Sequence, residues 1–173
     1  PLGAIVAGAR LVEPVLDAGG FLHGFTYAGN PMACAAGLAV LEEMEEQNLV
    51  ENAARMGDVL MAQLRGFMDR YPFIGDVRGR GLLTAFEFVS DRETMEPLPP
   101  ALNAYDRLVE LAYERGLIIY SRRTRGGTSG DHFLLAPPLI ISEAQIGEMM
   151  TILRDALDAF ASQAGLPVSE NAA

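Results

Sequence analysis

The chain has 173 residues and a formal net charge of −10, and half of its residues are apolar. This length fits one ordinary domain, or a small domain with a piece of another, and the apolar content allows a sizeable core. Nucleic acid and anionic membranes require a dense group of cations, which this acidic sequence does not contain. No apolar run approaches the roughly 20 residues that span a bilayer, and the first residues lack the pattern of a signal peptide. We therefore expect a cytoplasmic protein with neither nucleic acid nor membrane as a partner.

The first eight residues form a near-continuous apolar run, which is typical of a strand covered on both faces in a parallel sheet. No initiator methionine precedes this run. We therefore expect the chain to be a piece of a longer protein that begins inside a buried strand.

The stretch 23–37 combines a hydroxyl, flexible glycines and the start of a helix within one short loop. Asn30 can cap that helix, and Pro31 can occupy its first turn. Because a bound phosphate needs such donors, the stretch predicts a phosphate-binding loop. The alternative is that residues 24–30 form only a turn that caps the helix. The single cysteine, Cys34, is expected to be a small buried apolar side chain.

The rest of the sequence predicts further helices and strands. Helical spacing of apolar residues indicates helices over 30–44 and 53–68, with a break near 47–48. A glycine-pivoted strand pair, or one bent strand, is indicated over 75–89. The later elements are a helix capped by Gly116, strands at 117–120 and 133–136, a basic flexible loop at 121–130, and a last helix that starts with a capping box of Ser142 and Gln145.

This order lacks the even rhythm of a complete doubly wound domain. We expect residues 1–45 to be the end of a larger domain and residues 46–72 to form a linking helix. Residues 73–165 are expected to form a small α+β domain with helices on one face of its sheet. Residues 166–173 are small and polar, so we expect a disordered tail.

Several segments, in this order, resemble the C-terminal portion of class III, fold type I, pyridoxal 5'-phosphate (PLP) dependent aminotransferases. They are residues 1–4, 23–31 with 35–41, 77–82, 116–119 and 136–141, and the resemblance that they carry extends over nearly the whole chain. The resemblance implies a partial α/β fold of type I, with the end of the large domain followed by the C-terminal small domain. It also implies a homodimer or a dimer of dimers.

In that family the first of these segments follows a few residues after the lysine that forms the internal aldimine with PLP. This chain has no lysine, because all 13 of its basic residues are arginines. The resemblance therefore implies that the catalytic lysine lies upstream, in a missing N-terminal part of the same enzyme. We expect the chain to be inactive alone.

The resemblance also implies a cofactor contact in the glycine-rich loop. Thr26 would donate its hydroxyl to the PLP phosphate of the neighbouring subunit, with Phe25 and Tyr27 beside it at the dimer interface. No residue of this chain is implied as catalytic.

Residues 120–127 fall where related transaminases carry an arginine that binds the substrate carboxylate. Arg122 is the first candidate and Arg123 the second, since the planar guanidinium matches a carboxylate with two hydrogen bonds. The loop departs from the family pattern, because Tyr120 stands where some relatives have the arginine, and a solvated basic loop is the alternative. Arg78 and Arg80 are expected to pair with acids, and the alternative is that they face the site. The two histidines, His23 and His132, are isolated, so no metal site is expected.

The resemblance thus implies an aminotransferase that moves an amino group from an amine or amino acid to a keto acid such as pyruvate. The alternative is a non-catalytic interaction or regulatory module derived from the small domain of such an enzyme.

Overall fold

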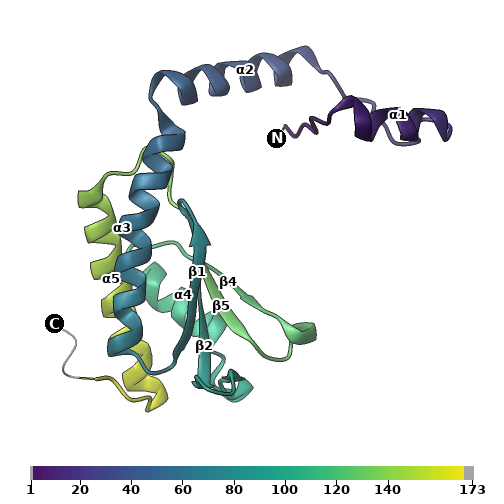
Figure 1. Ribbon diagram of the computed structural model, residues 1–173. Coiled ribbons are helices and arrows are strands. Elements are labelled where there is room, and N and C mark those ends of the chain that lie inside the picture. Colours follow the sequence, from purple (N-terminus) through teal and green to yellow (C-terminus); the bar gives the residue numbers. More distant parts are fainter. Residues whose placement is uncertain (1, 170–173) are drawn as a thin grey trace. The chain divides into compact units, whose positions relative to one another are not determined.

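The computed structural model describes residues 2–169, apart from the side chain of Arg125. The chain divides into two compact units, the first ending at Asn48 and the second beginning at Leu49. Figure 1 labels the helices and most of the strands, which are numbered in chain order.

The first unit contains two helices, α1 (Ala9–Asp17) and α2 (Pro31–Glu46). The predicted cap of α2 is confirmed, because the Asn30 side chain accepts a hydrogen bond of 3.1 Å from the backbone N–H of Ala33 and Pro31 occupies the first turn. The predicted break after this helix is also present, with Asn48 in the left-handed region at φ 51°.

The apolar run at the start of the chain is not a strand, so that prediction is wrong for residues 2–8; Pro1 lies outside the described residues. A strand needs a hydrogen-bonded neighbour, and the described strands all lie in the second unit. None of residues 2–48 is buried, and Cys34 is exposed rather than buried. The first unit therefore has no core of its own.

The second unit is built on an antiparallel sheet. Its strands are β1 (Ile74–Arg80), β2 (Leu83–Asp91), β3 (Glu96–Pro97), β4 (Tyr120–Arg123) and β5 (Asp131–Leu135). The strand order is β1-β2-β5-β4, and β3 pairs with β2. The strand pair predicted over 75–89 is confirmed, since β1 and β2 form an antiparallel hairpin.

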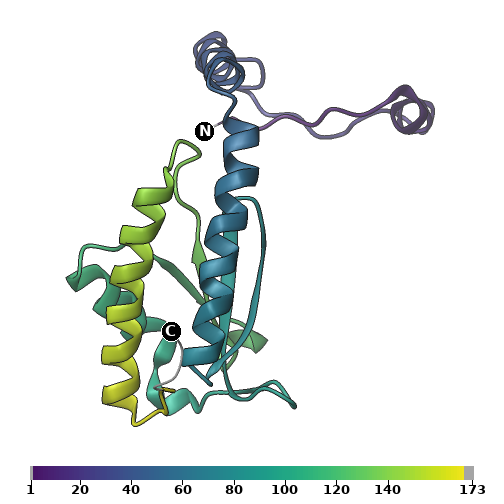
Figure 2. The same ribbon diagram turned by 60° about the vertical axis from the view of Figure 1, so that its left-hand side comes forward.

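Helices α3 (Leu49–Arg70), α4 (Ala104–Glu114) and α5 (Glu143–Ala164) cover one side of this sheet (Figures 1 and 2). Short 3-10 turns at Pro100–Leu102 and Arg125–Gly127 complete the unit. Aromatic rings fill the space between the layers, with Phe86 stacked on Phe133 at 5.0 Å and Phe88 on Phe160 at 5.4 Å. All four rings are fully buried, so the helices depend on this contact with the sheet.

The predicted ends of two helices are confirmed. Gly116 follows α4 at φ 87°, a left-handed conformation that suits glycine. Ser142 and Gln145 form the expected capping box at the start of α5.

The boundary between strand and basic loop differs from the prediction. The expected strand at 117–120 starts only at Tyr120, and it continues to Arg123, inside the segment expected to be a flexible loop. Antiparallel pairing with β5 joins Tyr120 to Leu134 and Arg123 to Asp131. These pairings, together with an ion pair at Arg123, outweigh the loop preference of a segment rich in arginine and glycine.

The expected tail at 166–173 is described only as far as residue 169. Leu166 and Val168 pack partly against the core, and the N–H of Ser169 donates a 2.8 Å hydrogen bond to the carbonyl of Arg70. Residues 170–173 lie outside the described residues, and their disorder stays a prediction.

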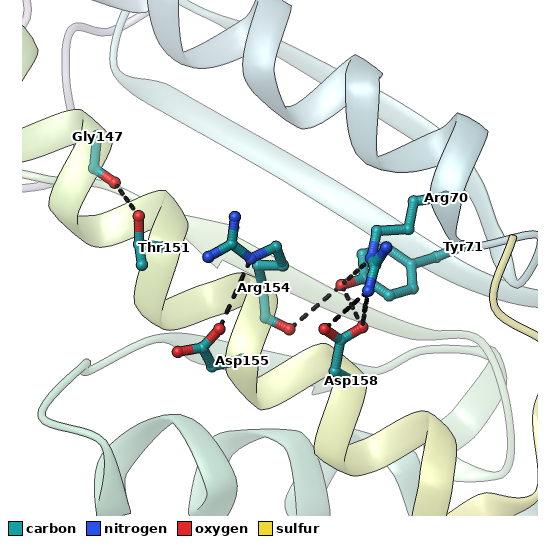
Figure 3. Close-up of polar contacts among 7 residues, drawn as sticks. All are labelled: Arg70, Tyr71, Gly147, Thr151, Arg154, Asp155 and Asp158. Atoms are coloured by element: carbon teal, nitrogen blue, oxygen red, sulfur yellow. Dashed lines mark hydrogen bonds and ion pairs between the residues drawn. The ribbon is translucent and has the colours of Figure 1, made fainter. Parts of the chain in front are cut away.

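A polar network joins the C-terminal end of α3 to α5 (Figure 3). The Tyr71 hydroxyl donates to Asp158 at 2.8 Å and lies 3.2 Å from the carbonyl of Arg154. Arg70 donates to both carboxylate oxygens of Asp158 at 3.0 Å. Burial raises the pKa of Tyr71, and the hydrogen bond to Asp158 raises the pKa of Arg70. The carboxylate of Asp158 thus binds the side chains of two consecutive residues, Arg70 and Tyr71.

Replacing Asp158 by alanine is expected to lower the free energy of unfolding by about 1–2 kcal/mol, because the buried Tyr71 hydroxyl loses its closest acceptor. Asp155→Ala is the matched control. It lies in the same helix, and within residues 2–169 its one ion pair is an exposed one with Arg154 at 3.6 Å, so its effect should stay within about 0.5 kcal/mol. Urea unfolding of both variants, followed by circular dichroism, checks the difference, and equal midpoints would contradict it.

Candidate functional site

The glycine-rich loop forms two successive turns before α2. The N–H of Ala28 donates to the carbonyl of Phe25 at 3.0 Å, and the N–H of Asn30 donates to the carbonyl of Tyr27 at 3.1 Å. Gly29 adopts φ 72°, which only glycine takes readily. The turns place Phe25, Thr26 and Tyr27 next to one another on the surface of the first unit, with the Phe25 and Tyr27 side chains 72% and 81% exposed.

Thr26 has unused donors at this position. Within residues 2–169, its hydroxyl and the backbone N–H groups of Thr26 and Tyr27 make no hydrogen bond. The helix start is different, because the side chain and carbonyl of Asn30 already bind the N–H groups of Ala33 and Cys34. The unused donors of the Thr26 turn therefore fit a phosphate group, whereas the N–H groups of Ala33 and Cys34 at the start of α2 are already bound by Asn30.

The two candidate arginines lie next to each other on β4, and their side chains point to opposite faces of the sheet. Successive residues of a strand alternate between faces. Arg123 points toward α4, where its guanidinium lies 4.3 Å from the centre of the Tyr105 ring. Arg122 shares the other face with Tyr120, whose ring lies 5.0 Å from the Arg122 guanidinium.

Arg123 is fully engaged inside the chain. Its Nε donates to Asp131 Oδ1 at 2.7 Å and its Nη2 to Asp131 Oδ2 at 3.1 Å. The hydrogen bond to Asp131 raises the pKa of Arg123. Asp131 is 4% exposed and also accepts from the N–H of Tyr105 at 3.3 Å. The guanidinium of Arg123 thus donates two hydrogen bonds to a carboxylate of its own chain.

Arg122 is exposed and available. Among the described residues its guanidinium makes no hydrogen bond or ion pair. It makes a cation–π contact with the Tyr120 ring. His132 lies directly opposite Arg122 on β5, and Glu87 lies opposite His132 on β2. Glu87 is itself bound by Arg78 at 3.0 Å. The face of the sheet that is turned away from the helices is called the open face here. At its β4 edge this face therefore presents the unpaired guanidinium of Arg122.

The glycine-rich hairpin holds the remaining candidates. Arg78 pairs with Asp76 and Glu87, which confirms the expected pairing with acids. Arg80 is exposed and has no ion pair within the described part of the chain, so its expected pairing is absent there. The sequence reasoning missed Asp131 and Tyr105. A hairpin register over 120–135 would have placed Asp131 opposite Arg123.

Within residues 2–169, no group of three or more His, Cys, Asp or Glu side chains could hold a metal ion. No helix in that range is long and apolar enough to cross a membrane.

The sequence model of the class III aminotransferases matches residues 1–157. The chain is 37% identical over 155 residues to an uncharacterized aminotransferase of Schizosaccharomyces pombe, covering 88% of this chain and 34% of that protein. It is 32% identical over 161 residues to gamma aminobutyrate transaminase 2 of Solanum lycopersicum, covering 91% and 33%.

Solved structures agree with this match. An amine transaminase from an uncultivated Pseudomonas species, in a PLP-bound internal aldimine form, is 37% identical with a TM-score of 0.71, covering 80% of this chain and 30% of that one. A thermostable (S)-enantioselective omega-transaminase from Thermomicrobium roseum is 34% identical with a TM-score of 0.73, covering 88% and 32%. The predicted fold class, a partial α/β fold of type I, is confirmed.

The chain therefore belongs to the class III aminotransferase family. It spans about a third of the length of the curated relatives that it matches.

Proposed function

We propose that the chain is the C-terminal part of a PLP-dependent transaminase that moves an amino group from an amine or amino acid to a keto acid such as pyruvate. The observation that carries the proposal is the exposed, unused donor set at Thr26, found in a chain that matches the class III family over residues 1–157. The complete enzyme would be a cytoplasmic homodimer, or a dimer of dimers.

PLP is the cofactor of the complete enzyme, as in the PLP-bound amine transaminase to which the chain is similar. When bound, PLP supplies the electron sink that lets an amino group leave one carbon and join another. This chain contributes contacts to the phosphate. The hydroxyl of Thr26 and the N–H groups of Thr26 and Tyr27 would donate to phosphate oxygens, and the exposed rings of Phe25 and Tyr27 would flank them across the subunit interface.

Arg122 would bind the carboxylate of the keto acid or amino acid. Its guanidinium is free for a two-point hydrogen bond, whereas that of Arg123 is held by Asp131. The geometry therefore favours Arg122 over Arg123 as the substrate contact. The Tyr120 ring would support the guanidinium from one side.

The missing partner would be the preceding part of the same enzyme. A chain without lysine has no side-chain amine to tether the cofactor, so it is expected to be inactive alone. The first unit supports this partnership, because residues 2–48 include no buried residue. It also has an apolar cavity of about 820 Å³, lined by residues 2–4 and by α2.

The proposal is tested with a complete enzyme, in which this chain is joined to the preceding two thirds of a class III transaminase. We expect this protein to convert an amine and pyruvate to a ketone and alanine with added PLP, while the isolated chain shows no turnover. Liquid chromatography of the alanine formed checks both. A joined protein that folds and binds PLP but forms no alanine would contradict the proposal and favour a non-catalytic module.

A further inference from the structure

Asp131 is the one charged residue that is buried among the described side chains of residues 2–169. It is 4% exposed and lies at the start of β5, beneath α4. Burying a carboxylate is costly unless donors surround it. Asp131 has three, namely Nε and Nη2 of Arg123 and the N–H of Tyr105. The group thus joins β5 to β4 and to the first turn of α4.

This arrangement also fixes the orientation of Arg123. Its side chain is 14% exposed and lies between the Asp131 carboxylate and the Tyr105 ring. A guanidinium held by a two-point hydrogen bond and a stacked ring cannot turn to the other face of the sheet without losing both contacts. The contacts of Arg123 therefore determine which side of β4 faces the helices.

The orientation of Arg122 follows from that of Arg123. Strand β4 has four residues and is an edge strand, with β5 as its neighbour on one side. Because side chains alternate along a strand, a fixed Arg123 directs Arg122 to the open face, where Tyr120 stacks against it. Backbone pairing with β5 holds this short edge strand, and the ion pair of Arg123 with Asp131 adds a side-chain contact that fixes the same register.

We propose that Asp131 is a positioning residue for substrate binding, because its hold on Arg123 keeps Arg122 on the open face of the sheet. The inference rests on the proposed role of Arg122 in binding the substrate carboxylate. It adds that this role depends on a buried acid which touches neither substrate nor cofactor.

The first test uses the 173-residue chain itself. In Asp131→Asn and Arg123→Gln, the ring-current shift that Tyr120 imposes on the Arg122 side-chain protons should shrink in NMR spectra of the folded protein. Tyr105→Phe is the matched control, since it keeps both the ring and the backbone N–H, and the shift should persist. Wild-type shifts in folded Asp131→Asn and Arg123→Gln would overturn the inference. If Asp131→Asn does not fold, the same NMR measurement is made on Arg123→Gln and Arg123→Lys instead.

The second test measures KM in the complete enzyme with two acceptors, pyruvate and propanal, which lacks the carboxylate. Arg122→Ala should raise the KM for pyruvate by roughly tenfold or more and leave that for propanal unchanged. Asp131→Asn should raise the pyruvate KM by several-fold, with kcat and the propanal KM unchanged, and should add nothing in the Arg122→Ala background.

The outcomes separate this inference from the proposed function. If Arg122→Ala raises the pyruvate KM but folded Asp131→Asn and Arg123→Gln do not, the positioning role is overturned and the substrate role stands. If Arg122→Ala leaves the pyruvate KM unchanged in an active enzyme, the substrate role of Arg122 fails and the inference falls with it. An equal loss with both acceptors would mean a purely structural role for Asp131, which also overturns the inference.

Discussion

Replacing Gly57 by alanine is expected to lower the free energy of unfolding of the second unit by about 3 kcal/mol. Gly57 lies on the buried side of α3, against the turn between β1 and β2. A Cβ atom at this position would lie 2.4 Å from the carbonyl carbon and oxygen of Gly81. Gly81 is itself held at φ 55°, so neither backbone can move away without disrupting the hairpin.

Gly66→Ala is the matched control for this prediction. Gly66 lies in the same helix and is exposed, and no atom lies within 4 Å of the place that an added methyl group would take. Alanine there should raise the stability by roughly 0.5–1 kcal/mol, because glycine is a poor helix former. Urea unfolding of both variants checks the contrast, and a similar midpoint for the two would contradict the close approach of α3 to the hairpin.

Thr26→Val is expected to weaken PLP binding by the complete enzyme by roughly 10- to 100-fold. Valine keeps the shape of threonine but removes the hydroxyl that would donate to a charged phosphate oxygen. Folding should be unaffected, because the Thr26 side chain is exposed and makes no hydrogen bond within residues 2–169. Thr26→Ser retains the hydroxyl and should bind PLP nearly as the wild type does. Equilibrium dialysis of PLP against the three proteins checks the series.

Local signals in the sequence predicted the ends of several helices, although helix α1 (Ala9–Asp17) was not predicted. Asn30, Gly116 and the Ser142–Gln145 capping box all mark helix ends where they were expected, because each satisfies backbone groups within a few residues. The hairpin over 75–89 was predicted as one of two options for the same reason. Gly57 in α3 and Gly81 in the hairpin turn allow these two elements to approach closely, and no local sequence pattern reveals this contact.

Strands that depend on distant partners were predicted poorly. The apolar run at 2–8 reads as a strand, yet no neighbouring strand exists for it among residues 2–169. Residues 121–123 read as a loop, yet pairing with β5 and the ion pair with Asp131 make them part of β4. In both cases the deciding interaction lies outside the local sequence.

The candidate site, too, could be predicted from the sequence only in part. The motif around Thr26 and the arginines at 122 and 123 could be found from the sequence, because their residue types suit phosphate and carboxylate. The sequence could not tell which arginine is free. That distinction comes from the alternation of side chains along β4 and from the buried acid opposite Arg123.

If the Thr26 turn binds the phosphate of PLP, Thr26→Val should act on PLP and not on pyridoxal, which lacks the phosphate. The decisive experiment compares the binding of both compounds by the wild-type complete enzyme and by Thr26→Val. We expect the substitution to weaken PLP binding by roughly 10- to 100-fold and to leave pyridoxal binding unchanged. An equal effect on both compounds, or no effect on PLP, would contradict it.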